Sequence, residues 1–187
     1  MTRARRVAMA AGLAAAAAGA AAMVCELPYV NWQPVVPPLA ARPLVIRQDA
    51  KGDGRFAAPR SGNRLHRGVD LAGAIDTPVQ AIRSGRVLEV GNQRGLGRFV
   101  VIQHDGGLRS LYAHLNATQV TEGLRVRQGA VIGTIGKTGN ARHPSIVPHV
   151  HFEVVRSGAV VDPQSLGLEF ELADVPTTET ADARGGE

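Results

Sequence analysis

The stretch Phe99-Val-Val-Ile-Gln-His-Asp-Gly-Gly-Leu-Arg-Ser-Leu-Tyr-Ala-His-Leu115 decides the fold class. It holds two runs rich in β-branched, aromatic and other apolar residues, separated by Asp105-Gly106-Gly107. Asp-Gly and Gly-Gly pairs between such runs are strong β-hairpin signals, because the turn needs residues that tolerate positive φ angles. We therefore predict two antiparallel strands, Phe99–His104 and Arg109–Leu115.

The same rhythm of short apolar runs and turns continues on both sides of this hairpin. Ser84-Gly85 and Ser157-Gly158 are further turn signals, and residues 49–163 show no sustained 3.6-residue apolar periodicity of the kind that predicts helices. An antiparallel all-β domain is therefore expected. Its further strands are predicted at Thr77–Ile82, Gly85–Val90, Ala130–Ile135, Val150–Val155 and Ala159–Val161.

The segments around this domain have a different composition. Residues 1–24 join a cationic start to an alanine-rich apolar stretch, which is the layout of a bacterial export signal. The alternatives are a leader retained as a membrane anchor, lipidation at Cys25, or an alanine-rich cytoplasmic helix. Residues 25–48 contain five prolines and are expected to form an extended linker, residues 49–166 the folded domain, and residues 167–187 an acidic disordered tail.

Charge and cysteine content exclude several classes of protein. The formal net charge is +5, but without the leader's Arg3, Arg5 and Arg6 the remaining 18 basic and 16 acidic residues give about +2. This balance removes the main argument for a nucleic-acid-binding protein. A single cysteine, Cys25, excludes intrachain disulfides and any cysteine-based zinc cage.

Histidines in three short motifs carry the candidate chemistry. His66 and Asp70 lie four residues apart at the entry to a strand and can converge on one cation. In the predicted strand at 150–155, His149, His151 and Glu153 project from one face because side chains two apart share a face.

The third motif is Tyr112-Ala-His114-Leu115, in which Tyr112 and His114 are expected to share a strand face. A catalytic zinc ion takes three protein ligands and keeps a fourth position for water. Two histidines and one aspartate would supply those ligands and leave other histidines for proton transfer. A lone histidine is more often a surface or core residue, but this combination favours a metal site.

These motifs together resemble the lysostaphin/LytM-like zinc metallopeptidases, and the resemblance runs through residues 52–163. It is carried by His66-x-x-x-Asp70, by Tyr112-Ala-His114-Leu115, by Pro148-His149-Val-His151-Phe-Glu, by Pro59-Arg60-Ser61-Gly62 and by Gly129-x-x-x-Gly133-x-x-Gly136-x-Thr138-Gly139.

The resemblance implies a compact, largely antiparallel β-sheet of barrel or sandwich form with one zinc ion in a groove. It implies that His66, Asp70 and His151 bind the metal and that His149 and His114 are catalytic. The loop at 140–147 is longer than in many relatives, which leaves substrate choice open. In that loop His143 is expected to face solvent, while His104 is expected to be structural, and Glu153 is expected to support the site rather than act as general base.

The function implied by the resemblance is hydrolysis of peptide bonds in the stem or cross-bridges of bacterial peptidoglycan, in the periplasm or cell envelope. Residues 49–163 carry 15 basic and 9 acidic side chains, and this excess of positive charge suits a polyanionic wall. Two alternatives come from other classes. One is an inactive LytM-like module that activates other wall hydrolases, and the other is a lipoyl-type carrier built around Lys137.

Overall fold

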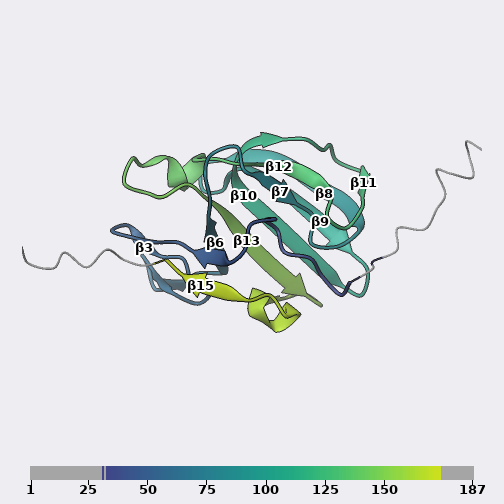
Figure 1. The fold of residues 1–187 in the computed structure, drawn as a ribbon, viewed down its shortest axis with the longest axis horizontal. Helices are drawn as coiled ribbons and strands as arrows, with labels where there is room; N and C mark the ends of the chain where they lie inside the picture. Colours follow the sequence, from purple (N-terminus) through teal and green to yellow (C-terminus); the bar gives the residue numbers. More distant parts are fainter. Residues whose placement is uncertain (1–30, 32, 174–187) are drawn as a thin grey trace, which may run out of the picture.

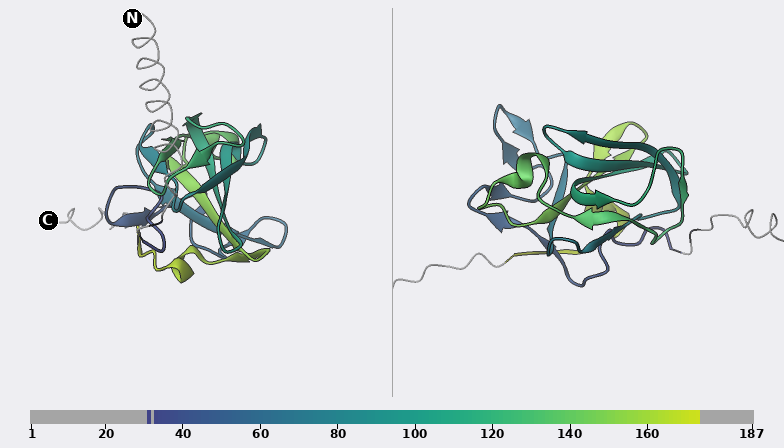
Figure 2. Two further views of the ribbon diagram at one scale, coloured as in Figure 1. Left: turned by 90° about the vertical axis from the view of Figure 1, so that its right-hand side faces the viewer. Right: turned by 90° about the horizontal axis from the view of Figure 1, so that it is seen from above.

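Strand β10 (Leu108–Thr118) is the hub of the main sheet and pairs with three others: β9 (Gly97–His104), β13 (His149–Arg156) and β12 (Val131–Ile135). The computed structural model describes residue 31 and residues 33–173. In these residues the main sheet is strongly curved, and β7 and β12 cross over the layer formed by β8, β9 and β10 (Figures 1 and 2).

The remaining elements are short. The other strands and the two 3₁₀ turns are β1 (Leu44–Ile46), β2 (Gln48–Asp49), β3 (Gly52–Asp53), β4 (Pro59–Arg60), β5 (Arg64–Leu65), β6 (Gly68–Ala72), β7 (Pro78–Gln80), β8 (Gly85–Gln93), β11 (Arg125–Val126), η1 (Gly139–Arg142), β14 (Ala159–Val161), η2 (Pro163–Leu166) and β15 (Phe170–Leu172). The order along the main path is β11-β8-β9-β10-β13-β6-β1-β15.

The all-β class is confirmed, and each strand predicted from the sequence has a counterpart. At the turn between β9 and β10, Gly106 and Gly107 both have a φ of +70°. The β13–β14 turn has Ser157 at +50° and Gly158 at +84°. Positive φ at two successive turn positions matches the right-handed twist of hairpin strands. Within the described residues every strand pairing is antiparallel except that of β1 with β15.

The core lies on one side of β13, as strand alternation predicts. Val150, Phe152 and Val154 are all fully buried, and the Phe152 ring packs 5.4 Å from that of Tyr112, centroid to centroid. The intervening residues His149, His151 and Glu153 therefore project from the opposite face. The apolar face holds the sheet together, and the polar face is left for the site.

The expected domain limits of 49 and 166 are too narrow. Val36, Leu39 and Leu44 are buried in the core, and β1 pairs with β6 on one side and with β15 on the other. The segment expected to be a linker thus contributes residues to the core. Its prolines suggested an extended chain, but the apolar residues that lie between them in the sequence are buried. Of the segment expected to be an acidic disordered tail, residues 170–172 form β15 at the end of the sheet, and residues 174–187 lie outside the described residues.

A chain of buried polar groups lies in the core and includes Tyr112 of the third histidine motif. His104 has Nδ1 3.1 Å from the carbonyl oxygen of Ser84, and its Nε2 lies 2.7 Å from Ser110 Oγ. The Tyr112 hydroxyl continues the chain 3.0 Å from Ser110 Oγ and accepts the amide N–H of Ile82. His104 therefore has the structural role expected for it.

This network predicts a pH-dependent stability. Burial, reinforced by the charge of Arg83, lowers the pKa of His104 below its ordinary value of 6.5. Below pH 6.5 the unfolded chain binds a proton at this position that the folded chain does not, so the stability contributed by His104 is lost as the pH falls. In urea unfolding with a chelator present, the stability difference between the parent and His104→Gln should shrink from pH 7.5 to pH 5.5. A constant difference would contradict the account, and the exposed His143→Gln is the control.

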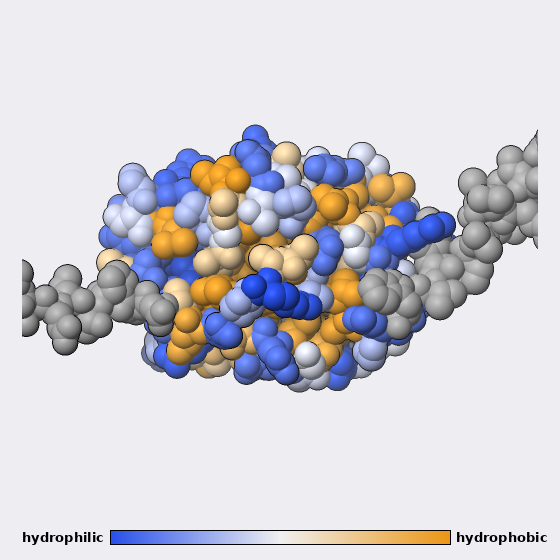
Figure 3. Space-filling view, viewed as in Figure 1, coloured by the Kyte–Doolittle hydropathy of each residue, from blue (hydrophilic) through white to orange (hydrophobic). Residues whose placement is uncertain are grey.

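The export signal or anchor predicted for residues 1–24, with Cys25, lies outside the described residues. In the part that the structure describes, no helix has the length and apolarity to cross a membrane. On the face drawn in Figure 3, hydrophobic residues are scattered in small groups among hydrophilic ones.

Candidate metal centre

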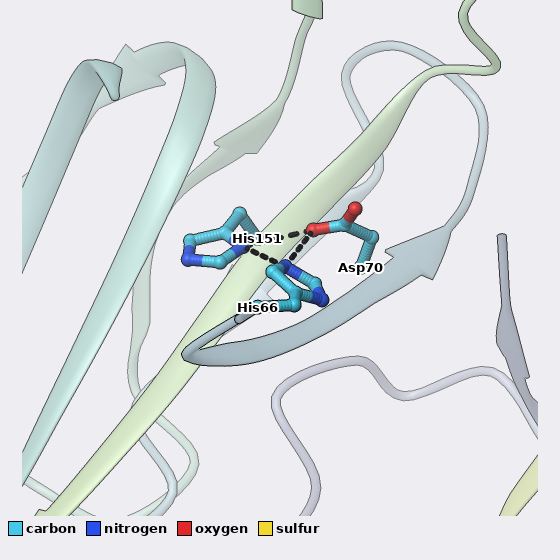
Figure 4. Close-up of side chains that lie close together, drawn as sticks. All are labelled: His66, Asp70 and His151. Carbon is cyan, nitrogen blue, oxygen red and sulfur yellow. Dashed lines mark hydrogen bonds and ion pairs between the residues drawn. The ribbon is translucent and has the colours of Figure 1, made fainter. Parts of the chain in front are cut away.

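Two neighbouring strands bring the first two histidine motifs together. Asp70 lies on β6 directly opposite His151 on β13, and His66 lies two residues before β6 begins. Figure 4 shows the three side chains converging. Gly68 permits this approach, because a Cβ atom there would lie 2.2 Å from the carbonyl oxygen of Phe152.

The three donor atoms form a tight triangle. His66 Nε2 lies 2.9 Å from His151 Nδ1 and 3.1 Å from Asp70 Oδ1, and His151 Nδ1 lies 2.8 Å from the same oxygen. All three residues are buried. Zn²⁺ binds nitrogen and carboxylate oxygen at about 2.0–2.2 Å, so its tetrahedral ligand atoms are roughly 3.4 Å apart, about half an ångström more than here.

Hydrogen bonds behind the cluster orient both imidazoles. His66 Nδ1 lies 2.7 Å from the carbonyl oxygen of Arg55, and His151 Nε2 lies 3.0 Å from Glu153 Oε1. A ring nitrogen that donates its N–H to such an acceptor leaves the other nitrogen's lone pair for a metal. Two ring nitrogens and a carboxylate oxygen then face one another, and a metal ion can take the place of the ring protons that otherwise bridge them, so the donor set fits a metal ion.

The electrostatics favour a cation at the same point. Burial alone would raise the pKa of Asp70, but hydrogen bonds with His151 and His66 hold it well below its ordinary value. Burial alone would lower the pKa of His151, yet hydrogen bonds to Asp70 and Glu153 raise it to about 9. Glu153 lies behind His151, in the supporting position expected for it.

Two further imidazoles stand beside the cluster. His149 Nδ1 lies 2.7 Å from the carbonyl oxygen of Val147, and His114 Nδ1 lies 2.9 Å from that of Thr138. The two rings meet edge to face with centroids 5.0 Å apart, and His149 Nε2 lies 3.9 Å from Asp70 Oδ1. Burial lowers the pKa of both histidines, that of His114 to about 3. Both are therefore neutral near pH 7 and able to accept a proton.

The expectation that Tyr112 and His114 share a face is wrong. Tyr112 packs in the core, whereas His114 lies on the face of His149 and His151. The cause is a break in strand register after Tyr112, where His114 adopts a φ of +63°. Such a left-handed residue in a bulge redirects the side chain, and non-glycine residues in this conformation concentrate at functional sites.

The structure thus brings all five expected site residues together, and His143 is exposed as predicted. The structure also places Arg47, from the segment expected to be a linker, beside the candidate metal ligands. Arg47 Nη2 lies 2.8 Å from Asp70 Oδ2. No local motif marks this arginine, because the contact depends on the pairing of β1 with β6.

The family model described as "Peptidase family M23" matches residues 64–163, which is more than half of the chain and contains all five residues. The chain belongs to peptidase family M23. The resemblance to lysostaphin/LytM-like peptidases is thereby confirmed.

Two known proteins illustrate how similar this chain is to its relatives. The chain is 43% identical over 105 residues to the DD-carboxypeptidase/endopeptidase Mpg of Neisseria meningitidis, which covers 56% of this chain and 23% of that protein. It is 34% identical over 116 residues to the murein hydrolase activator NlpD of Salmonella typhimurium, covering 62% of this chain and 29% of that protein. The chain therefore spans about a quarter of the length of these relatives.

A solved M23 structure shares the fold. The catalytic domain of the antimicrobial peptidase lysostaphin from Staphylococcus simulans superposes with a TM-score of 0.54 at 34% identity. The match covers 64% of this chain and 92% of that domain.

Proposed function

We propose that this M23 protein is a zinc-dependent endopeptidase that hydrolyses peptide bonds in the stem or cross-bridges of bacterial peptidoglycan. The observation that carries the proposal is the convergence of three buried donor atoms beside two neutral imidazoles. Neither the metal donors nor the two imidazoles alone would indicate an enzyme, because a metal site can be structural and paired histidines can be part of a core.

His66, Asp70 and His151 are proposed to hold one Zn²⁺ ion. Two neutral nitrogens and one anionic oxygen match the three-ligand sets of catalytic zinc sites. Bound zinc supplies Lewis acidity that activates water and polarises a carbonyl group. The hydrogen bonds that the two imidazoles donate to the Arg55 carbonyl oxygen and to the Glu153 carboxylate keep them aimed at the ion.

His149 and His114 are proposed to move the proton. Each presents Nε2 as an acceptor because its Nδ1–H donates to a backbone carbonyl. As water adds to the scissile carbonyl carbon, one imidazole takes the water's proton and the other can stabilise the developing oxyanion. When the C–N bond breaks, the proton passes to the leaving amine, so the products are a carboxylate and an amine.

The charge of the domain and the relatives of the chain support peptidoglycan as the substrate class. The positive excess of residues 49–163 would attract the carboxylates of peptidoglycan. The DD-carboxypeptidase/endopeptidase relative supports a peptidase of this type. We further propose that the protein is exported to the cell envelope on the strength of residues 1–24, and N-terminal sequencing of fractionated cells will show whether that leader is removed.

A second candidate function is activation of other wall hydrolases without catalysis. The similarity to a murein hydrolase activator favours it. The complete set of donor atoms and flanking imidazoles favours the enzyme, because a pure activator has no need of them.

Metal removal separates these two functions. The full-length protein should release peptides from purified peptidoglycan, lose that activity after dialysis against a chelator, and regain it on addition of one equivalent of Zn²⁺. Circular dichroism should show that the metal-free sheet stays folded, since it has its own apolar core. Hydrolysis that persists unchanged in the metal-free protein would refute the zinc mechanism.

A further inference from the structure

Arg47, in the segment between β1 and β2, contacts the outer side of the candidate metal ligand Asp70. Both residues are buried, with Arg47 5% and Asp70 4% exposed. Arg47 Nη2 donates to Asp70 Oδ2 at 2.8 Å, whereas Asp70 Oδ1 is the oxygen that faces His66 and His151. Oδ2 is therefore held by Arg47, with Arg60 Nη2 more distant at 3.5 Å, while Oδ1 faces the cluster.

Backbone hydrogen bonds also hold Arg47 and Asp70 next to each other. The amide N–H of Arg47 donates to the carbonyl oxygen of Asp70, and the amide N–H of Asp70 donates to that of Gly54, both at 2.8 Å. Gly54 in turn donates to the carbonyl oxygen of Arg47 at 2.8 Å. Arg47 and Asp70 are thus fixed relative to each other before any side-chain contact is counted.

A second carboxylate anchors the guanidinium. Arg47 Nη1 lies 2.7 Å from Asp49 Oδ2, and the same oxygen accepts the amide N–H of Val147 at 3.0 Å. The Arg47 Nε–H is buried without an acceptor, so the two Nη contacts carry the interaction. Val147 also supplies the carbonyl that orients His149, which links the same arginine to the proton-handling side of the site.

We propose that Arg47 is a positioning residue that holds Oδ2 of Asp70 and thereby keeps Oδ1 aimed at the metal. The proposal rests on the proposed zinc site, and it assigns a role to a residue outside the part of the chain that matches the M23 family model. Arginine suits this role because its planar fork can engage two carboxylates in a fixed geometry, which a lysine ammonium cannot do.

Two possible roles of Arg47 predict opposite changes in zinc affinity when the residue is replaced. If Arg47 acted only as a buried positive charge, its removal would relieve repulsion and tighten zinc binding. If it positions Asp70, its removal should weaken zinc binding about 10–100-fold, as loss of groups that orient metal ligands generally does. The sign of the change in affinity therefore decides between the two.

The experiment measures zinc affinity of the full-length protein by competition with a chromophoric chelator. Arg47→Gln should bind zinc about 10–100-fold more weakly than the parent, and Arg47→Lys about 3–10-fold more weakly. Arg109→Gln is the matched control, because this arginine near the start of β10 is exposed and is not part of the candidate site. Its zinc affinity should equal that of the parent.

A second readout reports on the ligand geometry itself. With Co²⁺ in place of zinc, freeing Oδ2 should let both oxygens reach the metal, and the resulting higher coordination number should weaken the visible absorption of Arg47→Gln. Parental or tighter zinc binding by Arg47→Gln would overturn the proposal. Should that variant fail to fold, parental binding by Arg47→Lys would overturn it. A parent that bound no zinc would instead refute the proposed function, and the inference with it.

Discussion

Replacing His66 by alanine is expected to abolish peptidoglycan hydrolysis and to weaken zinc binding by about 100-fold or more. This loss of zinc affinity should exceed that caused by changing a group that only orients a metal ligand. The physical reason is that the Nε2 lone pair of His66 is one of three donors within 3.1 Å of one another. The sheet should stay folded, because the core lies on the opposite face of β13 and does not depend on the metal.

His66→Ala is a cleaner test of the metal site than Asp70→Ala. Removing the Asp70 carboxylate would take away one of the two carboxylates that pair with the buried guanidinium of Arg47 and leave Asp49 as the other. Breaking a buried ion pair is destabilising, so loss of activity in that variant would not distinguish a lost metal ligand from a weakened fold. The control for His66→Ala is His143→Ala, an exposed histidine expected to keep parental zinc content and activity. Hydrolysis retained by folded His66→Ala would show that the metal ligands are wrongly assigned.

His149→Ala and His114→Ala are expected to lower turnover by about 10²–10⁴-fold while zinc content stays at the parental level. Both imidazoles are held neutral by burial and offer Nε2 beside the cluster, but neither belongs to the three-donor triangle. The measurement is turnover on purified peptidoglycan together with the zinc content of each protein. A His149→Ala protein that lost its metal would show that His149, rather than His151, is the ligand.

Local sequence signals anticipated much of this molecule. The Asp105-Gly106-Gly107 turn predicts the hairpin between β9 and β10, and alternation along residues 149–154 separates core residues from site residues. Both predictions hold because turn geometry and strand alternation depend on neighbouring residues. The four-residue spacing of His66 and Asp70 likewise anticipated their convergence, although their shared position opposite His151 required strand pairing.

Other features could not be predicted because they depend on contacts distant in sequence. The pairing of β1 with β15 joins residues that are more than 120 positions apart, and nothing in either segment indicates the other. The redirection of His114 coincides with a register break, at the point where β10 stops pairing with β13 and begins to pair with β12. The contact of Arg47 with Asp70 likewise follows from the pairing of β1 with β6, which joins segments distant in sequence.

The measurement that tests the central claim most directly is mass analysis of purified peptidoglycan digested by the full-length protein in the absence of any other hydrolase. An endopeptidase should produce peptides that carry new amino and carboxyl termini, each cleavage adding one water molecule, and these products should be missing when His66→Ala is used. If the parent yields no such products but increases cleavage by a separately added wall hydrolase, and His66→Ala does so equally well, the protein is an activator and the proposed mechanism is wrong.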